Sequence, residues 1–341
     1  GETSHYRVGL WKQKWSGGRL THFAPVEETL VVARPLFQDI TAYTFSGAAS
    51  FEQQLRRGVT YWRARLDSAC GIDVYGNNGI AVGDIDGDGW DEIYVCQPGG
   101  LPNRLYKNDG RGRFHDITQS AGVDVLDDTA SALFVDLRNN GRQDLVVMRG
   151  SGPLLFLNQG DGTFRNKPDA FRFATAPQGA FTGMAAADYD RDGRVDLYFC
   201  SYVYFQSEDQ YHYPVPYYDA RNGPPSFLFH NEGDGVLRDV TAEVGLNVEN
   251  NRFSFAAAWC DYDADGWPDL YVADDFGRKH LYKNERGRFR DVAAEAGVDD
   301  IGAGMSAAWF DYDDDGRPDL YVSNMWSTAG QRVTHEKDFS P

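Results

Sequence analysis

The residues best placed to do chemistry are carboxylates that recur at a fixed spacing. The clearest stretch is Asp261-Tyr-Asp-Ala-Asp-Gly-Trp-Pro-Asp-Leu, with acids at positions 1, 3, 5 and 9 and glycine at position 6, and related stretches begin at Asp84, Asp136, Asp188 and Asp311. Acids at alternate positions of a tight loop can converge on one ion, a carbonyl at position 7 adds an oxygen, and a later acid completes the shell. Aspartate and glycine also form ordinary turns, but five copies in register favour calcium loops.

Four of the loops carry the full acidic set, and the fifth does not. In the Asp136 loop, Arg138 stands at position 3 and Asn140 at position 5. Since the arginine could bridge the remaining acids, we expect this loop to keep its shape and to bind calcium poorly or not at all. The sequence thus predicts about four Ca²⁺ sites, with the ligands Asp84, Asp86, Asp88, Trp90 (carbonyl) and Glu92; Asp188, Asp190, Asp192, Arg194 (carbonyl) and Asp196; Asp261, Asp263, Asp265, Trp267 (carbonyl) and Asp269; and Asp311, Asp313, Asp315, Arg317 (carbonyl) and Asp319.

The composition excludes several classes of function. The chain has 341 residues and a formal net charge of −18. The acids at the loop positions account for this excess, so no basic partner is needed to explain it, and nucleic acid is an unsuitable partner for so acidic a chain. No run of 18 apolar residues is present, so we expect no membrane insertion.

The N-terminus and the cysteines bear on the protein's compartment. The first residues lack the apolar core of a signal peptide, so either a signal was removed or the sequence is an excerpt from a longer chain. Four scattered cysteines do not indicate a disulfide framework, and we expect Cys96 and Cys200, at equivalent places in two repeats, to be buried free thiols.

Residues 1–69 lie outside the repeats. The stretches 6–15 and 19–23 flank a glycine turn and predict a hairpin, and 29–33 is a further apolar run. Residues 48–68 have helical spacing of apolar residues and several arginines on other faces, although Gly58 weakens a helix. We expect a docking helix with a solvated basic face; contact with a membrane or an anionic ligand is the alternative.

From about residue 70 to 341 the chain repeats a four-strand unit at roughly 50 residues. Each unit has a small apolar strand, the acidic loop, an apolar strand, a third strand that ends in asparagine, and a fourth strand after a glycine turn. A four-stranded unit of this length predicts an all-β fold, a β-propeller of four-stranded blades. Alanine and glycine suit the first strand because innermost strands are crowded, and the loops should lie together on one face.

The repeats resemble the FG-GAP/VCBS class of integrin α-type propellers, and residues 70–330 are similar to bacterial homologues of cartilage acidic protein, a group often joined to an ASPIC/UnbV module. No such module is evident here. The resemblance implies a secreted or surface-exposed, seven-bladed, calcium-binding propeller. About four and a half blades are visible, because the fifth repeat stops after its second strand at Asn324.

Closure of the propeller is an open question at this stage. Residues 36–41 read Leu-Phe-Gln-Asp-Ile-Thr and match the fourth-strand pattern of residues 113–118. Such a strand could complete the unfinished blade of its own chain or pair with another copy.

A large insertion, residues 202–225, distinguishes the third repeat. It is rich in aromatic residues beside polar ones, which suits a carbohydrate platform, with Tyr204, Tyr211, Tyr213, Tyr217 and Tyr218 as the possible ligand surface. The alternative is a loop that covers the central channel with its own aromatics.

Three classes of function therefore remain. The leading hypothesis is a non-enzymatic extracellular binding or adhesion module for a protein or glycan, stabilised by calcium. The second is a structural subunit that polymerises with copies of itself by strand exchange through the N-terminal segment. The third is a calcium-dependent polysaccharide-active enzyme, which is disfavoured because the sequence shows no nucleophile elbow, phosphate loop or zinc-spaced cluster. The fold alone does not select the ligand.

Overall fold

The structure is a computed structural model that describes residues 4–16, 19–33, 37–66, 78–204 and 213–325. The chain divides into two compact units, residues 1–46 and 47–341. We expected a boundary near residue 69, whereas the unit that contains the repeats begins at Gly47. Each unit is described by itself.

The first unit contains a long β-hairpin and one short helix. Strands β1 (Ser4–Ser16) and β2 (Arg19–Ala33) pair antiparallel, so the predicted hairpin is confirmed, and β2 takes in both of the expected apolar runs. Within the expected strand at 36–41, the described residues 37–40 form no strand, and helix α1 (Thr41–Thr44) follows. The Asp39 carboxylate accepts the Thr41 N–H at 2.9 Å, so this stretch makes a local turn within its own unit.

The helical segment at the start of the second unit is broken into short pieces. The prediction of a single helix over residues 48–68 was wrong. The structure has three short segments there: α2 (Ala49–Gln53), the 3₁₀ turn η1 (Leu55–Arg57) and α3 (Gly58–Arg63). Gly58 has φ of +67°, which ends one helical segment and begins the next. Docking is confirmed, but through polar groups, because Gln54 donates to the Pro102 carbonyl at 2.8 Å and accepts from Arg104 Nε at 2.8 Å.

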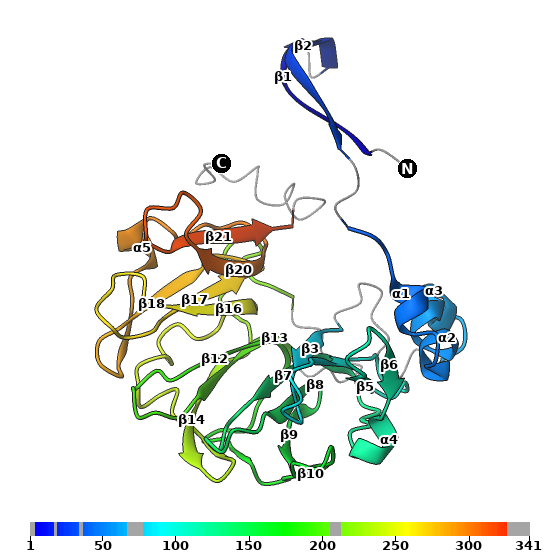
Figure 1. The fold of residues 1–341 in the computed structure, drawn as a ribbon. Helices are drawn as coiled ribbons and strands as arrows, with labels where there is room; N and C mark the ends of the chain where they lie inside the picture. The colour runs from blue at the N-terminus through cyan, green and yellow to red at the C-terminus, as the bar shows by residue number, and fades with distance from the viewer. Residues whose placement is uncertain (1–3, 17–18, 34–36, 67–77, 205–212, 326–341) are drawn as a thin grey trace. The chain divides into compact units, whose positions relative to one another are not determined.

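The repeats form antiparallel sheets in the predicted order, seen side by side in Figure 1. Blade 1 is β3 (Ile80–Gly83), β4 (Glu92–Val95), β5 (Arg104–Asn108) and β6 (Phe114–Asp116); blade 2 is β7 (Thr129–Val135), β8 (Asp144–Arg149), β9 (Gly152–Asn158) and β10 (Phe164–Asn166); blade 3 is β12 (Gly179–Ala187), β13 (Asp196–Tyr204), β14 (Phe227–Gly233) and β15 (Val236–Asp239); blade 4 is β16 (Ser254–Cys260), β17 (Asp269–Asp274), β18 (His280–Asn284) and β19 (Phe289–Asp291); and blade 5 is β20 (Gly304–Phe310) and β21 (Asp319–Asn324).

Some connecting elements were not expected from the sequence. The linker after blade 2 adds a short fifth strand, β11 (Phe171–Arg172), parallel to β15. Two linkers form single helical turns, α4 (Thr118–Ala121) and α5 (Ala293–Ala296). In each, the first helical N–H donates to the carboxylate of an aspartate two residues earlier, and a left-handed glycine follows the helix. The last blade has two strands among the described residues, as the sequence indicated.

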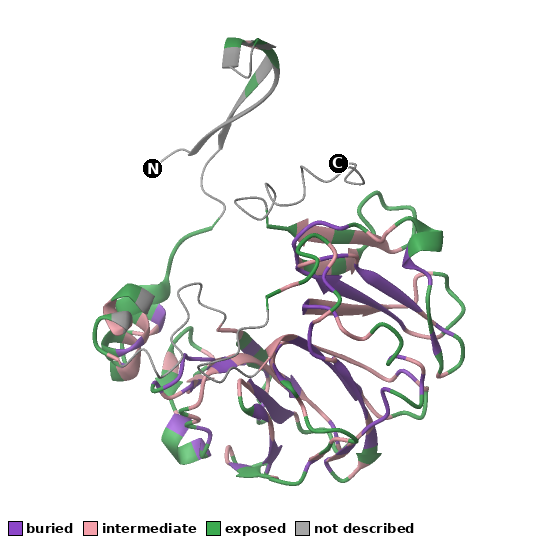
Figure 2. Ribbon diagram, turned by 180° about the vertical axis from the view of Figure 1, so that it is seen from behind, coloured by how far each residue is buried: buried purple, intermediate pink, exposed green. Residues whose placement is uncertain are grey.

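Hydrophobic cores lie between adjacent blades, where Figure 2 shows the second and third strands buried. The edge of the Tyr94 ring meets Phe134 between blades 1 and 2, and Tyr262 stacks on Trp309 between blades 4 and 5. The expected crowding of the first strands is confirmed at Gly183, where an added Cβ would lie 2.7 Å from the Phe255 carbonyl oxygen of the next blade. Cys96 and Cys200 are buried free thiols, as predicted.

Candidate metal centres and ligand surface

All five acidic loops share one backbone conformation, built around the position 1 carboxylate. Asp188 accepts the N–H groups of Asp192 and Gly193 at 3.0 and 2.9 Å, and Asp136 accepts those of Asn140 and Gly141 at 3.1 and 2.7 Å. The same pattern recurs at Asp84, Asp261 and Asp311. The altered loop therefore keeps its shape, as we expected.

Two loop positions have positive φ, of which the sequence analysis anticipated one. Position 6 is glycine in every loop, with φ between 77° for Gly141 and 88° for Gly193. Position 4 is also left-handed; it is Gly87 in the first loop but a non-glycine residue in the other four, for example Arg191 at 61° and Ala264 at 59°. This double turn directs the side chains at positions 1, 3 and 5 toward one point, which costs some backbone strain at position 4.

The closing acid at position 9 is fully buried in the four complete blades, at Glu92, Asp144, Asp196 and Asp269. Backbone N–H groups hold it: Asp196 accepts from Tyr189 at 3.2 Å and from Asn231 at 2.8 Å. Burial raises the pKa of Asp196 to about 8 and that of Asp269 to about 6. Burial therefore disfavours the ionised form of both carboxylates, and a nearby cation would favour it.

A lysine from the third strand supplies part of that positive charge in blades 1 and 4. The Lys107 ammonium contacts Asp86 and lies 3.0 Å from Asp88 Oδ2, and the Lys283 ammonium contacts Asp263. Hydrogen bonding to Lys107 is the main reason that the pKa of Asp88 is lowered. One lysine faces four acids in each loop, so the local charge stays negative.

In blade 2 the arginine performs the same task from within the loop. Arg138 donates from Nε and Nη2 to the two Asp144 oxygens at 3.0 and 2.7 Å, and Nη2 also donates to the Asn158 carbonyl at 2.8 Å. The expected bridging is thus observed for Asp144. Burial nonetheless leaves the pKa of Asp144 raised.

In each of the four fully acidic loops, three of the predicted acids come together, whereas Asp88, Asp269 and Asp319 lie outside these groups. Carboxylate oxygens within 4.8 Å of one another occur in four groups of acids, and a fifth group includes a histidine; among the described residues none occurs at the Asp136 loop. The groups are Asp84, Asp86 and Glu92; Asp188, Asp190 and Asp192; Asp261, Asp263 and Asp265; Asp311, Asp313 and Asp315; and Asp190, Asp196 and His230. At position 7, the N–H groups of Trp90, Arg194, Trp267 and Arg317 donate to the position 5 carboxylates.

Neighbouring loops contact each other, in agreement with the expected common face. Asn139 of blade 2 donates to the Gly193 carbonyl of blade 3 at 2.6 Å. The Arg191 guanidinium of blade 3 lies 5.4 Å from the Trp267 ring of blade 4. The loops therefore form a row along one side of the blades.

The asparagine that ends each third strand has a role that the sequence analysis missed. In blades 2, 3 and 4 its side chain is buried and donates both to its own loop and to a carbonyl in the loop of the preceding blade. The inter-blade bonds join Asn158 to Ile85 at 2.7 Å, Asn231 to Leu137 at 2.9 Å and Asn284 to Tyr189 at 2.8 Å. The recurrence of this asparagine at one repeat position was the available signal.

The described tyrosines of the third-repeat insertion divide into exposed and structural ones. Tyr213, Tyr217 and Tyr218 are exposed, with 66%, 44% and 37% of their surface accessible. Tyr204 is partly buried and donates to the Gly223 carbonyl at 3.0 Å, so it supports the insertion. Tyr211 lies outside the described residues.

The described part of the insertion is fastened to blade 4. Asp219 pairs with the buried Arg252 at 2.5 Å, and the Ala220 N–H donates to the Phe276 carbonyl at 2.6 Å. The Tyr217 ring packs on Phe276 with centroids 5.2 Å apart. The exposed tyrosines therefore stand on a fixed support.

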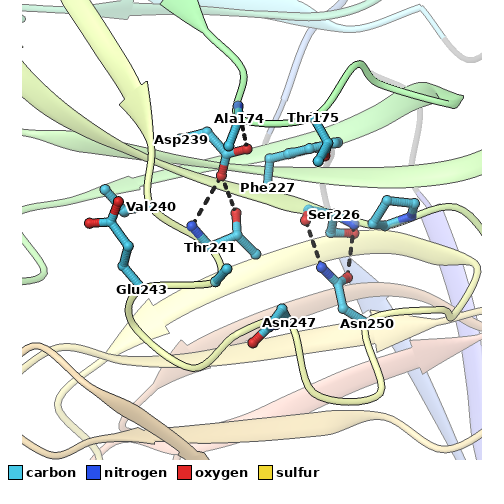
Figure 3. Close-up of a pocket in the computed structure, with 12 residues that line it drawn as sticks. Ala174, Thr175, Ser226, Phe227, Asp239, Val240, Thr241, Glu243, Asn247 and Asn250 are labelled. Atoms are coloured by element: carbon cyan, nitrogen blue, oxygen red, sulfur yellow. Dashed lines mark hydrogen bonds between the residues drawn. The ribbon is translucent and has the colours of Figure 1, made fainter.

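A small cavity of about 240 Å³ lies beside β15 and the linker that follows it, and Figure 3 shows its lining. Its polar atoms are already bonded. Asp239 accepts from Ala174 and Thr241, and Asn250 exchanges two hydrogen bonds with the backbone of Ser226. These bonds hold the linker in place, so the cavity is a weaker ligand candidate than the insertion.

Among the described residues, no helix is long and apolar enough to cross a membrane. Solved structures with a similar arrangement include an Agrocybe aegerita lectin described as recognising non-reducing terminal N-acetylglucosamine (16% identity, TM-score 0.39, 71% of this chain and 56% of that chain). The Vibrio cholerae biofilm matrix protein Bap1 (16%, 0.39, 72% and 34%) and the Bacillus licheniformis rhamnogalacturonan lyase PL11 (10%, 0.38, 72% and 55%) also match. These similarities are too distant to carry an argument about function.

Curated relatives are more informative. Cartilage acidic protein 1 of Xenopus tropicalis is 33% identical over 154 residues, 44% of this chain and 23% of the relative. The mouse and human proteins of that name are 25% and 26% identical over 223 residues, 64% of this chain and 32% and 31% of the relatives. This chain therefore spans about a quarter to a third of the curated relatives' length.

The family model for the FG-GAP-like repeat matches residues 84–147, 136–199 and 261–322, each match containing two of the acidic loops. Together these matches cover more than half of the chain. With its four-stranded blades and its similarity to cartilage acidic protein 1, the chain belongs to the FG-GAP-like repeat family and has the blade architecture of a β-propeller.

Proposed function

We propose that this chain is a calcium-stabilised propeller segment that acts outside the cell as a binding or adhesion module for a protein or glycan. The observation that carries the proposal is the set of four loops in each of which three acids converge. The closing acids of three of these loops, Glu92, Asp196 and Asp269, are fully buried. One basic side chain cannot balance four carboxylates, whereas a divalent ion with a preference for oxygen ligands suits them. The residues at positions 1, 3, 5, 7 and 9 fit Ca²⁺, which would supply charge neutralisation and cross-link each loop.

Terbium luminescence tests the metal assignment, because Trp90 and Trp267 stand at position 7 of two loops and can sensitise a bound lanthanide. We expect calcium to displace the luminescent ion, and Trp90→Phe and Trp267→Phe each to remove part of the signal.

If sites have Kd of roughly 0.1–1 mM, calcium at ten times Kd stabilises by about 1.4 kcal/mol per site and about 6 kcal/mol for four. A melting temperature that is indifferent to chelator, with the metal confirmed absent, would refute a structural role for calcium.

An extracellular location is supported by one observation, the name cartilage acidic protein 1 that the curated relatives carry. Extracellular calcium modules bind the ion with Kd of roughly 0.1–1 mM. A calcium titration of the melting temperature should therefore have its midpoint in that range. A midpoint near 1 μM would indicate an intracellular type of site.

We assign the ligand surface to the exposed tyrosines of the insertion. Aromatic faces at fixed positions suit sugar rings, which present apolar C–H faces, and the fixing by Asp219 lowers the entropy lost on binding. Glycan-array binding should be lost when Tyr213, Tyr217 and Tyr218 are replaced by alanine. The matched control is Tyr321→Ala, since Tyr321 is also exposed (59%) but lies in strand β21 of the last blade, outside the acidic loop. Binding that survives the triple replacement would remove the insertion as the ligand surface.

One observation favours strand exchange as a second function. The hydrogen bond from the Thr41 N–H to Asp39 repeats the one that follows the fourth strand in blades 1, 3 and 4, at Asp116, Asp239 and Asp291. Residues 37–44 thus have the local sequence and turn of a blade's fourth strand, and we propose that they add to an open blade edge of another copy. Deleting residues 1–46 should then convert assemblies to monomers in analytical ultracentrifugation. A wild-type chain that sediments as a monomer at all concentrations would exclude this function.

A further inference from the structure

The third blade differs from the others in the residue that faces its acidic loop. The residue before the third-strand asparagine is Lys107 in blade 1, Leu157 in blade 2 and Lys283 in blade 4, but His230 in blade 3. The backbone is placed alike in blades 3 and 4, because the following asparagine N–H donates to the closing acid at 2.8 and 2.7 Å. An imidazole therefore takes the place of an ammonium, and blade 3 differs further in having Arg194, whose guanidinium contacts Asp192, where blades 1 and 4 have tryptophan.

The His230 ring is directed into the carboxylates of its loop. Nδ1 lies 3.4 Å from Asp190 Oδ2 and 3.3 Å from Asp196 Oδ1, while Nε2 lies 3.8 Å from Asp192 Oδ2. Nδ1 is buried and makes no hydrogen bond. The Asp196 side chain is fully buried and that of His230 is 13% exposed. A buried ring nitrogen without a hydrogen bond, between two carboxylates, is the arrangement that a shared ion would satisfy.

These spacings match a transition-metal site. Metal–ligand bonds of about 2.0–2.2 Å in a tetrahedral shell place neighbouring ligand atoms about 3.4 Å apart. The two distances from Nδ1 agree with this value. Imidazole nitrogen is a common ligand of zinc and other first-row metals, whereas calcium selects oxygen.

We propose that Asp190, Asp196 and His230 form a site for a divalent transition-metal ion, distinct in metal class from the calcium loops of the other blades. The inference rests on the proposed metal-binding role of the loops but assigns blade 3 to a different ion. Asp188 remains bonded to the loop backbone and keeps the loop in shape. The ordinary alternative is that His230 is only a counter-charge, as the lysines are.

Cobalt titration of the tag-free chain tests this assignment, with and without millimolar calcium. We expect one Co²⁺ per chain, with a visible absorption band that stoichiometric Zn²⁺ removes. His230→Lys copies the residue of blades 1 and 4, and should weaken Co²⁺ binding at least about tenfold while leaving terbium luminescence at Trp90 and Trp267 unchanged. Lys283→His makes the reciprocal change and should add a second Co²⁺ site in blade 4.

The outcomes separate this inference from the calcium proposal. Cobalt binding that is equal in wild type and His230→Lys would belong to another histidine and would overturn the site. Absence of any cobalt binding would also overturn it, whether or not terbium binds. Cobalt binding that depends on His230 in a chain that binds no terbium would support the site while refuting calcium in the other loops. If His230→Lys does not fold, the Lys283→His variant provides the test: a second Co²⁺ site in that variant would support the inference, and its absence would overturn it.

Discussion

Replacing Arg138 by alanine should destabilise the protein strongly without changing its calcium response. The Asp144 side chain is fully buried and Arg138 is 21% exposed, and two hydrogen bonds of 2.7 and 3.0 Å join them. Removing one partner of a buried ion pair costs about 3–5 kcal/mol, because the other charge is left without compensation. Since Asp144 keeps the Asn158 N–H at 2.8 Å, we expect a loss near the lower end, about 3 kcal/mol.

The pH dependence of this loss follows from Asp144. Burial raises its pKa in the folded protein above the unfolded value, and removing the guanidinium should raise it further. Between the unfolded and folded pKa the folded state binds more protons, so stability falls as pH rises. The difference between Arg138→Ala and wild type should therefore shrink as pH is lowered from 7 toward 5.

Urea denaturation at pH 5 and pH 7, with calcium and with chelator, measures both effects. Arg142→Ala is the matched control, because Arg142 belongs to the same loop but is exposed, and its guanidinium donates to the Gln159 carbonyl at 3.2 Å. A loss below about 1 kcal/mol in Arg138→Ala at pH 7 would show that the ion pair does not replace a metal. A calcium-dependent recovery in Arg138→Ala would show that this loop is a metal site after all.

Three further changes test other features of the blades. Asn231→Asp removes the donor to Leu137 and places a second carboxylate beside Asp196, so urea denaturation should show a loss of about 1–3 kcal/mol, whereas Asn247→Asp, at an exposed position, should be neutral. Lys107→Met removes a competing cation from the first loop, so calcium affinity at the Trp90-sensitised site should rise about two- to fivefold, and an unchanged affinity would show that Lys107 leaves the loop freely. His280 pairs with Asp291 at 2.7 Å, and this pairing raises the pKa of the histidine against the effect of burial and lowers the pKa of Asp291. The stabilisation by the pair should be lost when the pH rises through the folded pKa of His280 or falls through the folded pKa of Asp291. His280→Gln should therefore flatten the dependence of the melting temperature on pH above about 6.5.

Repeat spacing predicted most of the blade architecture, because every blade solves the same packing problem with the same residue types. The third strand of blade 1, residues 104–108, ends in asparagine as expected, and the loops adopt one backbone with or without the full set of acids. Local context decided what spacing could not. Gly58 broke the expected helix, and strand β11 joined blade 3 because a neighbouring edge was available.

The candidate sites were predictable where the chemistry is local to one loop and unpredictable where it crosses blades. Acids at alternate positions identify their own cluster, but the partner of Asn158 lies in the preceding blade, 73 residues away. The basic residue that faces each loop comes from a strand whose register a single sequence does not show. Of the predicted tyrosines, Tyr204 supports the insertion, a role that composition cannot separate from ligand contact.

Charge balance suggests that metal dependence is graded along the chain. The buried closing acid of each complete blade requires positive charge nearby, and three arrangements supply some of it: an arginine within the loop of blade 2, a lysine in blades 1 and 4, and a histidine in blade 3. Arg138 pairs with the buried Asp144, and its loop has one further acid, Asp136, so we expect blade 2 to need an ion least. In blades 1 and 4, one lysine against four acids leaves an excess of negative charge that a divalent ion would offset.

The described part of blade 5 has no third strand and brings no such basic residue to Asp311, Asp313 and Asp315. Calcium should accordingly stabilise the last blade most, and its protection from hydrogen exchange should be the first to fall when the metal is withdrawn.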